Sequence, residues 1–145
     1  MRIVFGLGVA AMALASCSQP KELAVDGAWV RLGAVTGRPA AAYFTVHGGP
    51  TPATLISVTT DVAIKSEMHE TMDEGGLSTM AQLTRVEIPA KTDVTFAPGG
   101  RHVMLFNMNS GIKPADRVTL TFAFADGTRI INNATVVAAG TPAGK

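Results

Sequence analysis

The chain has almost no cysteine, because Cys17 is the only one among its 145 residues. A single cysteine excludes a disulfide framework within the chain. If Cys17 is used up by processing at the N-terminus, the folded part has neither a nucleophilic thiol nor a thiolate that could bind a metal ion. Any metal site in the folded part must therefore use other side chains.

An excess of charge of one sign is also lacking, since 12 Lys and Arg residues stand against 11 Asp and Glu residues. Aromatic residues make up only 6% of the chain. We find no basic patch and no aromatic ladder, so we expect no nucleic-acid partner. The hydrophobic content of 47%, with 16% charged residues, is typical of one globular domain and not of a disordered chain.

The N-terminus has the three parts of an export signal. Arg2 provides the positive charge, residues 3–14 are apolar, and a small-residue site, Leu-Ala-Ser-Cys, ends at Cys17. The apolar stretch is too short to span a membrane. Because the site ends at cysteine, it resembles the lipobox of bacterial lipoproteins, whose cysteine is acylated and becomes the mature N-terminus.

We therefore predict a lipoprotein signal peptide over residues 1–17, with lipidation of Cys17 as the membrane anchor. A plain secretory signal with an incidental cysteine is the alternative. The predicted location is the bacterial cell envelope, facing the periplasm. Ser18, which stands where an aspartate would favour the inner membrane, favours the outer membrane.

Apolar runs of strand length follow, separated by Gly, Pro, Asn and Asp, and no helical period is present. The expected strands cover residues 23–31, 40–47, 54–59, 64–69, 77–83, 93–96, 102–108, 117–124 and 128–137. This pattern predicts an all-β fold, an antiparallel β-sandwich of the cupredoxin-like or immunoglobulin-like kind with about eight or nine strands. A closed barrel is the alternative. We expect a tether over 18–22, the domain over 23–138 and a flexible tail over 139–145.

Histidine and methionine are unevenly distributed. Beyond residue 17, every methionine lies between positions 68 and 108, and two of the three histidines lie there too. His102 and Met104 are two apart on one expected strand, so they point the same way about 7 Å apart. His69 ends another expected strand and Met80 lies on the next one, so four ligands from three strands can meet.

The types of ligand in this set select the metal. Thioether sulfur is a soft, neutral ligand that suits copper, Cu(I) in particular, whereas zinc would want cysteine or carboxylate. Thioethers also need no deprotonation to bind, and they are not lost to disulfides in an oxidising compartment. The set therefore predicts a Cu(I) site.

Ten residues separate His69 from Met80, twenty-one separate Met80 from His102, and one separates His102 from Met104. With this H-x10-M-x21-H-x-M spacing, the chain resembles the PCu(A)C-type periplasmic copper chaperones. The resemblance implies a cupredoxin-like sandwich with one exposed Cu(I). It also implies delivery of copper to the copper A site of cytochrome c oxidase subunit II, beside Sco-type proteins, and no enzymatic activity.

The remaining candidate residues receive simpler interpretations. We expect Met68 to pack in the core, Met108 to be a packing residue, and His47 to face solvent or cap a turn. Met72, expected in a turn before a loop over 73–76, is either a possible auxiliary metal ligand or an exposed rim residue. We expect three aromatic residues to pack in the core and on the sheets, with an aromatic ring beside the Cu(I) site as the alternative: Trp29, Tyr43 and Phe44.

Three other functions are considered for this sequence, and the first of them is excluded by the lack of cysteine in the folded part. Blue-copper electron transfer would need a cysteine thiolate, which the folded part lacks. Copper sequestration for tolerance needs the same ligands as delivery does. A metal-free envelope lipoprotein that binds a partner through its sheet edges is the third alternative.

Overall fold

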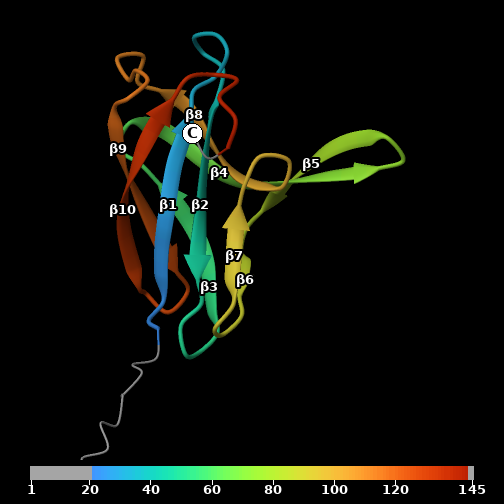
Figure 1. Cartoon of the computed structure of the whole chain (residues 1–145), viewed down its shortest axis with the longest axis vertical. Coiled ribbons are helices and arrows are strands. Elements are labelled where there is room, and N and C mark those ends of the chain that lie inside the picture. The colour runs from blue at the N-terminus through green and yellow to red at the C-terminus, as the bar shows by residue number, and fades with distance from the viewer. Residues whose placement is uncertain (1–20, 144–145) are drawn as a thin grey trace, which may run out of the picture.

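The computed structural model describes residues 21–143, so the predicted signal peptide and Cys17 lie outside the described residues. Within this range the chain forms ten strands and no helix (Figure 1). The strands are β1 (Ala24–Arg31), β2 (Ala40–His47), β3 (Ala53–Thr59), β4 (Ala63–Glu74), β5 (Leu77–Leu83), β6 (Val86–Ile88), β7 (Asp93–Phe96), β8 (Arg101–Met108), β9 (Arg117–Phe124) and β10 (Arg129–Val137). The described residues accordingly contain no helix long and apolar enough to cross a membrane.

The strands form one open sheet in the order β5-β4-β8-β2-β1-β10-β9-β3-β6, with β7 paired to β2 beside this path. The sheet curls over its core, so that β3 contacts β4 although they are far apart in this order. Ser66 on β4 donates a hydrogen bond to the carbonyl of Val58 on β3, at 2.6 Å. The expected all-β fold is confirmed, and because the sheet is open, the closed barrel is wrong.

The core consists of the apolar residues at alternate strand positions. In β9 the four even positions are buried, which is the period expected of a strand with one buried face. At the centre, the ring of Phe44 stacks on Phe96 at a centroid distance of 4.3 Å and meets Phe122 edge-on at 4.7 Å. The predicted core positions of Phe44 and Met68 are confirmed.

The hairpin of β4 and β5 is longer than the sequence predicts. Pairing continues from Met68↔Leu83 to Glu74↔Leu77, and only Gly75 and Gly76 remain in the turn. Both glycines have positive φ, +58° and +81°, as a two-residue hairpin turn requires. The expected turn at Met72 and loop over 73–76 are therefore wrong, because pairing with β5 overrides the low strand propensity of acidic residues.

Two other features of the sheet differ from expectation. β6 is a tenth strand of only three residues, and it pairs with β3. β1 and β10 are parallel, whereas the sequence predicts antiparallel strands throughout. Two parallel strands need a long connection between them. Here the two strands are the first and the last of the domain, so the chain that connects them is most of the domain itself.

His47 ends β2, and its imidazole lies between two carboxylates. Its Nδ1 is 2.8 Å from Asp93 Oδ1 on β7, and its Nε2 is 2.8 Å from Asp26 Oδ1 on β1. The hydrogen bond that the imidazole donates to Asp26, followed by the one it donates to Asp93, raises the pKa of His47 above its usual value. His47 thus joins three strands through ion pairs and does not cap a turn.

Candidate metal centre

The register of β4 and β8 brings the two predicted histidine ligands together. His69 and His102 are direct partners in this antiparallel pair, and Met104 lies opposite Glu67 two residues along. Side chains of directly paired residues project from the same face of a sheet. The ring centroids of the two histidines are 5.9 Å apart. Metal–nitrogen bonds of about 2 Å would place two imidazoles on one ion with centres roughly 5–6 Å apart, so the rings are already at a suitable separation.

The ring of His102 is fixed by a backbone carbonyl in the turn that precedes β8. The His102 side chain is buried, with 6% of the residue exposed, and its Nδ1 lies 3.0 Å from the carbonyl oxygen of Gly100. A carbonyl only accepts hydrogen bonds, so Nδ1 carries the proton in the neutral ring. The lone pair is then on Nε2, which is the nitrogen that can bind a metal ion.

The ring of His69 is fixed through its other nitrogen, Nε2, and by a carboxylate. Its Nε2 is 3.0 Å from Glu67 Oε2, while Lys65 Nζ is 2.9 Å from Glu67 Oε1. The hydrogen bond from Lys65, followed by that from His69, holds the pKa of Glu67 below its usual value. The Nδ1 atom of His69 is buried and has no hydrogen-bond partner.

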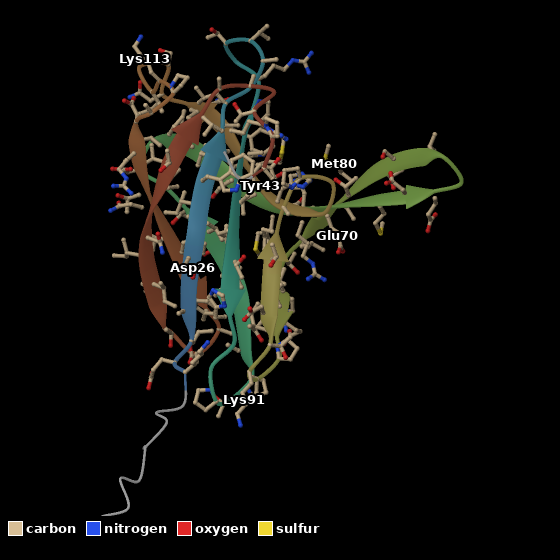
Figure 2. The ribbon with its side chains drawn as sticks, viewed as in Figure 1. Asp26, Tyr43, Glu70, Met80, Lys91 and Lys113 are labelled. Atoms are coloured by element: carbon tan, nitrogen blue, oxygen red, sulfur yellow. The ribbon has the colours of Figure 1, made fainter. Side chains whose placement is uncertain are left out.

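The two predicted methionine ligands, Met80 and Met104, line the same shallow pocket as His102. Thr71, Tyr43 and Arg31 line it too. Met80 is paired with Thr71, so it is a diagonal neighbour of His69, within reach of a long side chain. Figure 2 shows Met80 where the β4–β5 hairpin leaves the body of the domain. Met80 is 62% exposed, so most of this residue is accessible from solvent.

Met72 is separated from this group. It lies next to Thr71 on β4 and opposite Thr79, so its side chain projects from the other face of the hairpin than Met80 does. Met72 is 43% exposed. The structure therefore brings His69, His102, Met104 and Met80 to one face and leaves Met72 on the other.

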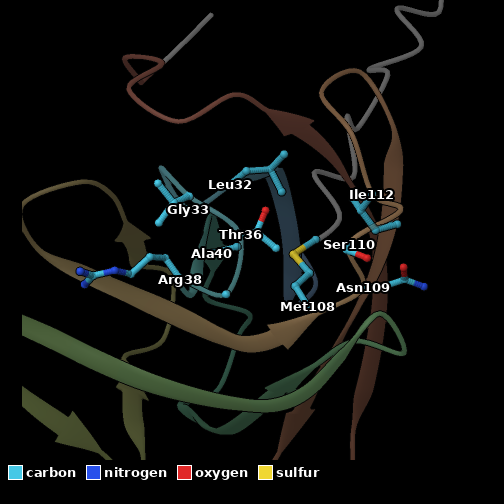
Figure 3. Close-up of a pocket in the computed structure, with 11 residues that line it drawn as sticks. Leu32, Gly33, Thr36, Arg38, Ala40, Met108, Asn109, Ser110 and Ile112 are labelled. Carbon is cyan, nitrogen blue, oxygen red and sulfur yellow. The ribbon is translucent and has the colours of Figure 1, made fainter.

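Met108 belongs to a different part of the molecule. It packs against the core and lines a second pocket with Leu32 and Ile112, between the loops that follow β1 and β8 (Figure 3). This agrees with its interpretation as a packing residue.

Glu67 and Arg31 lie near the proposed ligands and were not predicted, whereas Tyr43 fits the alternative of an aromatic ring beside the site. Glu67 could have been found from the E-x-H pattern, since residues two apart on a strand share a face. Arg31 donates a hydrogen bond from Nη2 to the hydroxyl of Tyr43, at 2.8 Å, in the same pocket as His102. Burial raises the pKa of Tyr43 above its usual value. Arg31 and Tyr43 come from different strands, so no local sequence signal joins them.

The donor set of the site is soft and largely neutral. Within residues 21–143, no three side chains of the His, Cys, Asp and Glu types come together in a way that could hold a metal ion. The paired histidines are instead flanked by thioethers, which favour Cu(I) over hard or borderline divalent ions.

A curled, open β-sheet with this site defines a cupredoxin-like domain of the PCuAC class. The structure is similar to that of the copper-bound PCuAC domain from PmoF2, with a TM-score of 0.66 and 21% identity, covering 83% of this chain and 96% of that one. It is also similar to the solution structure of CuI-DR1885 from Deinococcus radiodurans. That likeness has a TM-score of 0.68 and 28% identity, and covers 86% and 85% of the two chains.

Residues 23–136 match the family described as LpqE-like lipoproteins. The chain belongs to this lipoprotein family, which is the PCuAC family. A lipoprotein of Leifsonia xyli subsp. xyli, Lxx21020, is 30% identical over 132 residues, which is 87% of this chain and 79% of that protein. Both names agree with a protein of the cell envelope.

Proposed function

We propose that this protein is a periplasm-facing chaperone that binds one Cu(I) through His69, Met80, His102 and Met104 and passes it to an acceptor. The observation that carries the proposal is the direct pairing of His69 with His102 on β4 and β8. Met104 and Met80 line the pocket next to that pair. Copper in the similar structures of PmoF2 and CuI-DR1885 supports the choice of metal.

The arrangement suits a carrier because its parts differ in exposure. His102 is buried and fixed by the Gly100 carbonyl, so it stays in place when copper leaves. Met80 is largely exposed on a projecting hairpin, so an acceptor's ligand can displace it first. Neutral thioethers exchange without a proton step, which allows transfer through mixed-ligand intermediates. We therefore assign Met80 as the exit ligand.

The acceptor that we propose is the copper A site of cytochrome c oxidase subunit II, with Sco-type proteins acting beside it. This assignment rests on the family resemblance of the His and Met spacing. Lipidation at Cys17 would hold the domain at a membrane surface, and we favour the outer membrane. Copper carriage requires no bond-making in a substrate, so we propose no enzymatic role.

Copper transfer tests delivery against sequestration. The Cu(I)-loaded domain is mixed with the soluble copper-binding fragment of an oxidase subunit II, and the copper in each protein is measured after separation. Delivery predicts that most copper moves to the fragment. Copper that stays on a domain that binds it tightly would favour sequestration, and a domain that retains no copper would favour the metal-free alternative.

A further inference from the structure

We infer that Glu67 is a positioning residue that makes Nδ1 of His69 the copper donor, while His102 donates through Nε2. The inference deepens the proposed function and rests on it. It assigns the donor atom of each histidine and a role to a carboxylate that binds no copper itself.

Glu67 determines which ring nitrogen of His69 carries the proton. The Nε2 atom of His69 lies 3.0 Å from Glu67 Oε2, and an ionised carboxylate can only accept a hydrogen bond. In the neutral ring, Nε2 therefore carries the proton and Nδ1 carries the lone pair. A metal ion can bind only the nitrogen that has the lone pair.

The other ring nitrogen of His69, Nδ1, is buried and lacks a hydrogen-bond partner among the described residues. A buried polar atom without a partner costs free energy, and such atoms are rare unless another group completes them. A copper ion next to His102 would supply the missing partner of His69 Nδ1.

Lys65 fixes the carboxylate of Glu67. Lys65 Nζ holds Oε1 of Glu67 at 2.9 Å, so Oε2 stays directed at the ring of His69. Lys65, Glu67 and His69 alternate along β4 on one face of the sheet. The carboxylate also places a negative charge behind the imidazole, which strengthens the ring as a ligand.

His102 provides an internal contrast. Its Nδ1 donates to the Gly100 carbonyl, so the lone pair is on Nε2. The two histidines are direct partners on adjacent strands, yet their backing groups select opposite tautomers. The site is therefore asymmetric, and only the His69 half depends on a side chain that can be substituted.

The test begins with tautomers, which need no copper. Long-range proton–nitrogen NMR correlations of the apo domain at about pH 8 report which ring nitrogen is protonated. We expect His69 with its proton on Nε2 and His102 with its proton on Nδ1. Adding Cu(I) should shift the His69 Nδ1 and His102 Nε2 signals. A wild-type His69 that carries its proton on Nδ1, or binds Cu(I) through Nε2, would overturn the inference.

Substitutions of Glu67 give the second readout. Glu67→Ala should convert His69 into a mixture of tautomers and lower Cu(I) affinity by about 10- to 100-fold. Glu67→Gln keeps an accepting oxygen, so it should retain the tautomer and lose less affinity. Glu74→Gln is the control, since it removes the same charge from an exposed position on the same strand. NMR amide spectra confirm that each variant is folded.

The outcomes separate this inference from the proposed function. Wild-type affinity in a folded Glu67→Ala variant, or an equal loss in Glu74→Gln, would overturn the role of Glu67 while copper binding stands. A wild-type domain that retains no Cu(I) would overturn the proposed function, whatever its tautomers are.

Discussion

At the scale of single residues, β8 carries the proposed ligands on one face and core residues on the other. His102 and Met104 line the pocket on the outer face, while Val103 and Leu105 are fully buried in the core. The alternation follows from strand geometry, in which neighbours point to opposite faces. Ligand and scaffold can therefore be changed independently on one strand.

Two substitutions on β8 test this separation. Met104→Leu keeps a similar volume, so the free energy of unfolding should change by less than about 1.5 kcal/mol, while Cu(I) affinity falls because a thioether is lost. Leu105→Ala should cost about 2–5 kcal/mol through a core cavity, while the folded fraction still binds copper. Thermal melts of the apo variants and competition with a Cu(I) chelator measure both effects. If Met104→Leu unfolds the domain or binds copper like the wild type, Met104 is not a ligand.

At the scale of elements, the β4–β5 hairpin carries two of the four proposed ligands on a projecting arm. β4 is paired on both sides near His69 but only to β5 near its end, so the outer half of the hairpin has no second neighbour strand. Figure 1 shows this half extending away from the other strands. The position of Met80 therefore depends on the turn at Gly75 and Gly76.

Substituting a turn glycine tests the dependence of the site on this arm. Gly76→Ala places a side chain at a φ of +81°, which costs about 1–2 kcal/mol. We expect faster amide exchange in β5 and weaker Cu(I) binding, with little change in global stability. Gly127→Ala is the matched control, because Gly127 has a φ of +89° in the hairpin of β9 and β10, which carries no proposed ligand. Equal copper affinities in the two variants would contradict this account.

Sequence patterns predicted the elements well and their partners less well. Apolar runs of strand length identified β2 and β9, and in β9 the alternation of large apolar residues with smaller or polar ones also matches its buried face. β6 was missed because three residues are too few to show a period. The outer half of β4 was missed because its acidic residues read as a loop, and only pairing with β5 makes it a strand.

The candidate site was predictable in its residue types but not in its asymmetry. The spacing of His69, Met80, His102 and Met104 indicated four candidate ligands, and the sheet register brings them to one face. The backing groups of the two rings depend on side-chain placement, one being a carboxylate and the other a backbone carbonyl. No sequence period encodes such contacts, so they became visible only in three dimensions.

At the scale of the whole molecule, the stability of the domain should depend on pH through His47. Its two carboxylate partners, Asp26 and Asp93, favour the protonated ring, so the folded state holds the proton more tightly than the unfolded state does. This contribution is fully present below the unfolded pKa of about 6.5 and is lost as the pH rises through the higher folded pKa.

Chemical denaturation of the apo domain between about pH 6 and 9, which extends upward from the reference histidine pKa of about 6.5, tests this linkage. The free energy of unfolding should fall with rising pH in the wild type and vary less in His47→Gln. A wild-type curve that is parallel to that of the variant would show that the ion pairs of His47 do not stabilise the fold.

The whole molecule is also expected to be held at a membrane by its N-terminus. In Cys17→Ala the acyl acceptor is removed, so the precursor should not be processed at the lipoprotein site and should lose its membrane association. The domain begins after this position, so folding and copper binding should be unchanged. Cell fractionation measures the first effect and chelator competition the second. Membrane association that persists in Cys17→Ala would contradict the lipobox assignment.

The central claim is that one Cu(I) is held by two imidazoles and two thioethers. X-ray absorption spectroscopy at the copper edge of the loaded wild-type domain, together with its copper-to-protein ratio, measures this most directly. We predict one copper per chain, in the Cu(I) state, with both nitrogen and sulfur neighbours, and loss of one sulfur neighbour in each of Met80→Leu and Met104→Leu. Copper with only nitrogen and oxygen neighbours, or sulfur neighbours unchanged in both variants, would contradict the account.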